Sequence, residues 1–196
     1  TFTLIDVMKT VKLVKQLSPE TKVVLGGPQV PAQPQDFLES TPYVDLIVHY
    51  EGEITFSEIL RERLRVNPDY SRVDGISLRG QDGHHIQTPG RARTQDLEVL
   101  PSPYVAGCFD YLMNETYDFH ASQETHRGCP YSCTFCDWGS AVFTKIRQFS
   151  DERLHSELEW FGKNQIELLY NCDANFGLLN RDLSLTQKMS ETKKAF

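Results

Sequence analysis

The sequence predicts an α/β fold, and two alternating patterns support that prediction. In the first third of the chain, segments with helical periodicity alternate with short apolar runs, at residues 4–17, 22–25, 36–40, 44–49 and 54–64. Helix, strand, helix, strand, helix with short links is typical of a doubly wound, Rossmann-like parallel domain, here a partial one. In the last third, strand-like runs at 119–125 and 166–170 are each followed by a helical pattern, which predicts further strand–helix units.

The first helix and the two strands after it follow from residue spacing. Apolar residues recur at steps of three and four, and Ser18-Pro19 ends the pattern; these residues are Leu4, Val7, Met8, Val11, Val14 and Leu17. The strands at 22–25 and 44–49 end in Gly26-Gly27 and in Tyr50-Glu51-Gly52. Gly26, Gly27 and Gly52 are therefore expected at the carboxyl edge of the sheet, where open α/β domains bind ligands; the alternative is that they only form turns.

Residues 67–107 are predicted to be a linker that contains a β-hairpin. Segments 73–78 and 84–88 flank Asp82-Gly83, a common hairpin turn, and a proline-stiffened stretch follows at 97–104. The predicted domains are therefore 1–66, 67–107 and 108–196. His49, at the end of a strand, is expected to be solvated or hydrogen-bonded rather than a metal ligand.

Three of the five cysteines, Cys129, Cys133 and Cys136, lie within eight residues. Three soft ligands at this spacing suit an iron–sulfur cluster, and a [4Fe–4S] cluster held by three thiolates leaves one iron open. The alternatives are a zinc site, with His126 or Asp137 as fourth ligand, and a chance cluster of buried thiols. The other two cysteines, Cys108 and Cys172, are expected to be small core residues.

Composition excludes several classes of protein. The net charge of −7 disfavours a nucleic-acid-binding surface. The sequence contains no run of eighteen apolar residues, which a membrane-spanning helix would require. Five cysteines with three in one loop do not form a disulfide framework, and a low-potential cluster implies a reducing, cytoplasmic location. Because the chain does not begin with methionine, we expect a fragment of a longer protein that is poorly stable alone.

The thiol spacing carries a resemblance to a known family. Cys-x3-Cys-x2-Cys, with Phe135 before the third cysteine, resembles the cluster loop of radical S-adenosylmethionine (SAM) enzymes. The segments LGGPQVP and VDLIVHYEGE resemble the later half of the cobalamin (B12)-binding domain that precedes the barrel in a subgroup of these enzymes. The Asp-x-His-x-x-Gly motif of other cobalamin proteins is absent from the sequence. The resemblance implies part of a cobalamin-binding domain followed by the first strand–helix units of a radical SAM β/α (partial TIM) barrel.

The same resemblance implies roles for particular residues. Cys129, Cys133 and Cys136 would hold the [4Fe–4S] cluster, and Phe135 would pack near the adenine of SAM. Asp173 and Asn175 follow the second barrel strand, where the family contacts the SAM amino group through a Gly-Gly-Glu-like motif; the alternative is an Asx turn. Trp138 would shield the cluster or simply pack. Gly26, Gly27 and Gly52 would face cobalamin.

The implied activity is reductive cleavage of SAM, with cobalamin-dependent methyl transfer to an unactivated carbon or phosphorus. A flavodoxin or ferredoxin is the implied reductant, and the substrate is not identified. The alternatives are a cobalamin-associated radical rearrangement, methylthiolation, for which a second cluster domain is missing from the sequence, and a zinc-binding α/β interaction module.

Overall fold

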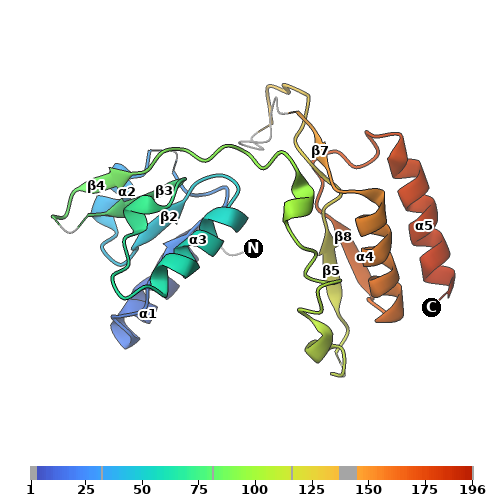
Figure 1. Ribbon diagram of the computed structural model, residues 1–196, viewed down its shortest axis with the longest axis horizontal. Coiled ribbons are helices and arrows are strands. Elements are labelled where there is room, and N and C mark those ends of the chain that lie inside the picture. Colours follow the sequence, from blue (N-terminus) through green and yellow to red (C-terminus); the bar gives the residue numbers. More distant parts are fainter. Residues whose placement is uncertain (1–3, 32, 81, 116, 137–144, 196) are drawn as a thin grey trace. The chain divides into compact units, whose positions relative to one another are not determined.

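A computed structural model describes residues 4–31, 33–80, 82–115, 117–136 and 145–195. The chain forms two compact units, Thr1–Thr94 and Gln95–Phe196, and Figure 1 shows the elements of each. The boundary follows the β-hairpin, whereas the sequence analysis placed that hairpin inside a linker over 67–107.

The first unit contains one four-stranded sheet. Its elements are α1 (Leu4–Leu17), β1 (Val24–Leu25), α2 (Gln35–Ser40), β2 (Leu46–Val48), α3 (Glu53–Arg63), β3 (Ile76–Arg79) and β4 (His85–Gln87). The strand order is β1-β2-β3-β4. β1 and β2 are parallel, whereas β3 is antiparallel to both β2 and β4. The sheet is therefore mixed and not wholly parallel as expected, because the predicted hairpin pairs with β2 and extends the sheet.

Helices cover both faces of this sheet. Successive side chains of a strand point to opposite faces. Ile47 accordingly packs with Leu25 and Leu38 against α1 and α2, while Leu46 and Val48 pack with α3. This three-layer arrangement of helix, sheet and helix agrees with the α/β class that the sequence predicts.

The chain leaves the hairpin along α3. The Gly75 N–H donates to the Pro89 carbonyl over 2.8 Å, and the Arg91 guanidinium binds both Thr55 and Glu58 of α3. Arg91, to which the sequence analysis assigned no role, therefore fixes the last segment of the first unit.

The second unit is built on a parallel strand pair. Its elements are β5 (His120–Gln123), β6 (His126–Arg127), β7 (Arg147–Gln148), α4 (Asp151–Lys163), β8 (Leu168–Asn171) and α5 (Arg181–Ala195), with short 3-10 turns at Leu97–Val99 and Asp110–Leu112. β5 and β8 are parallel, with His120 opposite Leu168 and Gln123 opposite Asn171. α4 lies between them in the sequence, so β5, α4 and β8 form one strand–helix–strand unit.

The sequence predicts that a helix starts at Ser150-Asp151 with Leu154, Leu158 and Phe161 on its apolar face, and α4 agrees on both points. The Ser150 hydroxyl accepts a hydrogen bond from the Arg153 N–H. Leu158 and Phe161 pack on Ala121 of β5, and Figure 1 shows α4 and α5 side by side. None of the described helices is long and apolar enough to span a membrane.

The apolar run at 166–170 predicts a buried strand, and this prediction is wrong for β8. β8 has three exposed residues out of four, and Tyr170 retains 55% of its exposure. Among the described strands, β8 pairs only with β5, so its other edge has no neighbour there. An apolar run predicts that a strand is suited to burial. It does not say whether the described residues supply the side chains that would bury it.

Candidate functional site

The three-thiol loop starts at the carboxyl end of β5. The chain passes through β6 to Gly128, which is buried and has a φ of +106° that favours glycine. Cys129 follows and is half-buried, while Cys133 and Cys136 are exposed. The Cys136 N–H donates to the Cys133 carbonyl over 3.0 Å, which closes a turn between these two thiols.

A short antiparallel ladder, which the sequence analysis missed, closes the base of this loop. His126 pairs with Gln148, and Arg127 pairs with Arg147. Each strand has only two residues, all of them polar, so the sequence has no apolar pattern that would predict the pairing. The ladder holds together the two ends of the segment that contains the thiols.

The donor set fits an iron–sulfur cluster in its chemistry. None of the five cysteines, all of which lie in the described part of the chain, forms a disulfide, and thiolates are the usual ligands of such clusters. In the described ranges, no three His, Cys, Asp or Glu side chains converge as a metal ion would require. The three thiols are therefore close in sequence and outside any disulfide, while their convergence is not part of this conformation.

The residues between Cys133 and Cys136, Thr134 and Phe135, are exposed. Phe135 is 89% exposed, so its expected packing near adenine stays a prediction. Asp137, Trp138 and Gly139 lie outside the described residues. The exposed phenyl ring therefore lies between two exposed thiols.

The structure gives Asp173 partners that the sequence analysis did not anticipate. Its side chain has no exposed surface. Oδ1 accepts the N–H groups of Thr125 at 2.7 Å and His126 at 3.1 Å, and Oδ2 accepts the Thr125 hydroxyl at 2.5 Å. Burial raises the pKa of Asp173, but hydrogen bonds from His126 and Thr125 outweigh it and lower the pKa to about 2.

These contacts bear on two sequence-based predictions. Both oxygens of Asp173 are engaged inside the protein, so contact with an ammonium group would require some of these bonds to be exchanged. The Nδ1 atom of His126 lies 3.3 Å from Asp173, while its Nε2 atom is buried and has no hydrogen-bond partner in the described structure. Histidines that bind a metal commonly donate their other ring N–H to a carboxylate, so His126 stays a candidate for the fourth ligand of a zinc site. The Asx-turn alternative has support, because the Asn171 Oδ1 accepts the Asp173 N–H over 2.9 Å.

Asn175 lies two residues farther along and is half-buried. Its Nδ2 atom is buried and has no hydrogen-bond partner in the described structure. Cys172 and Cys108 are exposed, so the prediction that they are core residues is wrong. Cys172 follows an exposed strand whose open edge was not evident from the sequence.

Gly26, Gly27 and Gly52 lie at one sheet edge, as predicted. β1 and β2 are parallel neighbours, with Leu25 opposite Ile47, so Gly26-Gly27 and Gly52 follow adjacent carboxyl ends. Gly27 has a φ of +95°, and a Cβ at Gly52 would lie 3.4 Å from a Val48 methyl group. The edge therefore has little side-chain bulk at these positions.

His49 and Tyr50 occupy the same edge. The His49 Nε2 lies 2.8 Å from the Ser77 hydroxyl, which confirms the expected hydrogen-bonded histidine. Burial, with a smaller contribution from His85, lowers the pKa of His49. Tyr50 has a φ of +59°, rare for a residue with a side chain, and is 66% exposed.

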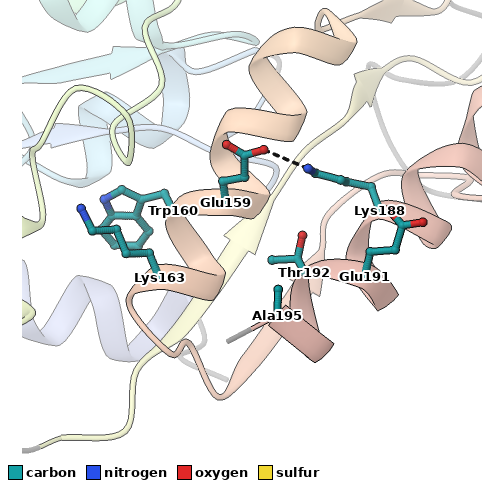
Figure 2. Close-up of a pocket in the computed structure, with 7 residues that line it drawn as sticks. All are labelled: Glu159, Trp160, Lys163, Lys188, Glu191, Thr192 and Ala195. Carbon is teal, nitrogen blue, oxygen red and sulfur yellow. Dashed lines mark hydrogen bonds and ion pairs between the residues drawn. The ribbon is translucent and has the colours of Figure 1, made fainter.

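Two grooves lie beside α4 and α5. Figure 2 shows one of about 450 Å³, in which Lys188 of α5 reaches Glu159 of α4 over 2.8 Å. It lies at the carboxyl ends of both helices, the opposite end of this unit from the thiol loop (Figure 1). The second, of about 570 Å³, is mainly apolar and lies between these helices and β8. Neither groove is lined by the thiols.

A parallel strand–helix–strand unit that presents three thiols at the end of its first strand is the arrangement expected of a radical SAM enzyme. Comparisons with known proteins point to the same class. The chain is 45% identical over 190 residues to the cobalamin-dependent radical SAM methyltransferase TokK of Streptomyces tokunonensis, covering 95% of this chain and 28% of that protein. It is also 45% identical over 192 residues to the 2-(S-pantetheinyl)-carbapenam-3-carboxylate methyltransferase of Streptantibioticus cattleyicolor, covering 96% and 28%.

Solved structures show the same fold. The radical SAM methyltransferase TsrM from Kitasatospora setae matches with a TM-score of 0.64 and 19% identity, over 97% of this chain and 37% of that chain. The cobalamin-dependent radical enzyme OxsB matches with a TM-score of 0.60 and 22% identity, over 96% and 26%. No protein-family model matches the chain.

The resemblance to cobalamin-binding-domain radical SAM enzymes is therefore confirmed by the sequence comparison, and the fold is that of the two solved structures. The chain spans about 28% of the length of the two curated relatives named here. The similarity extends over nearly all of this chain, through both of its units.

Proposed function

We propose that this chain is part of a radical SAM enzyme that transfers a methyl group with the help of cobalamin. The observation that carries the proposal is the three-thiol loop, placed at the carboxyl end of β5 in a parallel strand pair and contained in a chain 45% identical to TokK. In β/α barrels this end of the strands contains the reacting groups.

Cys129, Cys133 and Cys136 are the residues that would hold a [4Fe–4S] cluster. When bound, the cluster supplies the electron that cleaves SAM, and cobalamin supplies the methyl group. Cys133 and Cys136 are exposed, so they can approach a cluster without unpacking a core. The β6–β7 ladder anchors the two ends of the loop that contains the thiols. Phe135 would pack near the adenine, and the side-chain oxygen of Asn175 would accept a hydrogen bond from the amino group of SAM.

The first unit would bind cobalamin at the edge formed by Gly26, Gly27 and Gly52. Low side-chain bulk at that edge suits the close approach of a large flat ligand. The finer fold description, a partial Rossmann-like cobalamin domain followed by the first units of a partial TIM barrel, belongs to the same proposal. The acceptor would be an unactivated carbon or phosphorus, the reductant a flavodoxin or ferredoxin, and the location cytoplasmic.

Anaerobic reconstitution tests the proposal directly. Wild-type protein should take up about four iron atoms per chain and give an EPR signal that changes on addition of SAM. Replacing Cys129, Cys133 and Cys136 by serine should abolish iron uptake. A double variant of Cys108 and Cys172 to serine is the matched control, because both thiols are exposed and outside the loop.

Stoichiometric zinc in place of iron, or iron uptake that survives the triple substitution, would overturn the proposal. The cobalamin assignment has its own measurement. After incubation with hydroxocobalamin, the protein should retain corrinoid through gel filtration, and bulky substitutions at Gly26 and Gly52 should remove it.

A further inference from the structure

The residue before the thiol loop is held on both sides by charged side chains. The N–H and hydroxyl of Thr125 donate to the Asp173 carboxylate, and the Thr125 carbonyl accepts a hydrogen bond of 2.6 Å from Arg181. Thr125 itself has no exposed surface. One residue is thus bound by an anion at its N–H and by a cation at its C=O, both buried, and each such hydrogen bond is stronger than one between neutral groups.

The same two charged residues reach the other segments at the base of the loop. Asp173 also accepts the His126 N–H in β6. Arg181 also donates to the carbonyl of Phe149, the residue directly after β7. Because Phe149 in turn donates its N–H to Thr125 over 3.1 Å, both ends of the loop are tied to the segment that runs from β8 into α5.

Arg181 is an unfavourable residue for its local position. It is the first residue of α5, where the helix dipole favours anions and disfavours cations. Its side chain is only 14% exposed and also pairs with Asp151 over 3.0 Å. The two carbonyl groups that Arg181 binds, and not the helix, stabilise its buried charge at this end of α5.

We infer that Asp173 and Arg181 are positioning residues that fix the base of the three-thiol loop to the β8–α5 segment. They touch no thiol in the described contacts and act through Thr125, His126 and Phe149. The inference rests on the proposed function only in that the thiols are taken to be the cluster ligands. It replaces the expectation that Asp173 itself contacts SAM.

The test uses the whole protein with two readouts, amide hydrogen exchange and iron uptake. In Asp173→Asn, exchange of the Thr125 and His126 amides should accelerate roughly ten- to hundredfold, the range expected for loss of a hydrogen bond to a charged group. The rate of iron uptake during reconstitution should fall at least about threefold. Arg181→Lys should give a smaller acceleration, because an ammonium group can still bind one of the two carbonyls.

The matched control is Asp45→Asn in the first unit. Asp45 also accepts a backbone N–H, that of Val23, and pairs with Lys15 and Lys22, so it should be comparably destabilising while leaving iron uptake unchanged. If Asp173→Asn does not fold, Thr125→Val removes only the hydroxyl contact to Asp173. It should accelerate exchange of the Thr125 and His126 amides by a smaller factor, because their backbone hydrogen bonds to Asp173 remain.

Unchanged exchange at residues 125–127 and unchanged iron uptake in a folded Asp173 variant would overturn the inference. Acceleration spread evenly over the second unit would also overturn it, because that pattern indicates general destabilisation and not loss of a local anchor. Failure of the proposed function is a different result: wild-type protein would take up no iron, while the exchange effect of Asp173→Asn would remain.

Discussion

The buried network of Gln123, Arg153 and Glu157 gives the sharpest prediction for stability. The Glu157 side chain is 4% exposed, and its two oxygens accept hydrogen bonds from Gln123 over 3.0 Å and from Arg153 over 3.1 Å. Arg153 also lies 4.1 Å over the ring of Phe149. Glu157 thus connects α4 to the last residue of β5, two residues before Thr125.

Glu157→Ala should lower the free energy of unfolding of the second unit by about 3–5 kcal/mol. Each of the two lost hydrogen bonds involves a charged group and is worth about 1.5–3 kcal/mol, and breaking a buried ion pair from one side leaves its partner uncompensated. Glu157→Gln should cost less, because the amide oxygen can still accept one hydrogen bond while the charge is lost.

Urea unfolding followed by tryptophan fluorescence measures this loss. Both tryptophans, Trp138 and Trp160, lie in the second half of the sequence, so fluorescence reports on that unit and not on the first. The control replaces all three network residues by apolar ones, Gln123→Met, Arg153→Met and Glu157→Leu, and should recover at least half of the loss. A cost below about 1 kcal/mol for Glu157→Ala would refute the described network.

Three further outcomes can be checked in the same protein. The pKa of Asp173 is about 2, below its usual 3.8, so the stabilisation by its carboxylate is complete above about pH 4 and is lost as the pH falls toward 2. Above pH 4 the free energy of unfolding of wild type should exceed that of Asp173→Asn by about 2 kcal/mol, and urea titrations should show this difference shrinking at lower pH. Gly128→Ala should cost about 1–3 kcal/mol and reduce iron uptake, since the φ of +106° strains any side chain; equal iron content in the two proteins would count against it. Tyr50→Gly should leave the first unit as stable or up to about 1 kcal/mol more stable, whereas Tyr50→Val should destabilise it, as seen by circular dichroism; equal effects would exclude backbone strain.

Local patterns in the sequence predict the helices well. The first helix was expected over 4–17 and is observed there as α1. The Ser150 cap before two acidic residues predicts the start of α4, which begins at Asp151. Helix periodicity and caps involve residues a few positions apart, so they can be recognised without knowing the rest of the fold.

Pairings between distant segments could not be predicted in the same way. A hairpin of the segments 73–78 and 84–88 was expected, but its pairing with β2 places Ile47 opposite Ser77, and neither residue indicates the other. The ladder of β6 and β7 and the anchoring by Arg181 are likewise non-local. One indirect signal was present, since an arginine at the start of a helix opposes the helix dipole and suggests another partner.

The candidate site shows the same division. The spacing of Cys129, Cys133 and Cys136 identified the class of protein that the comparisons support. Asp173 was recognised as significant from its place after a strand, but its partners depend on a residue 48 positions earlier. The geometry therefore changed the expected contact of this carboxylate while leaving its importance intact.

Each half of the chain has hydrophobic clusters of its own. Ile47 and Ile59 anchor the clusters of the first half, and Leu154 and Leu158 anchor those of the second. Because each unit has its own hydrophobic core, recombination of the gene near codon 94 would leave both cores intact. Either unit could therefore be fused to a different domain, by evolution or by design.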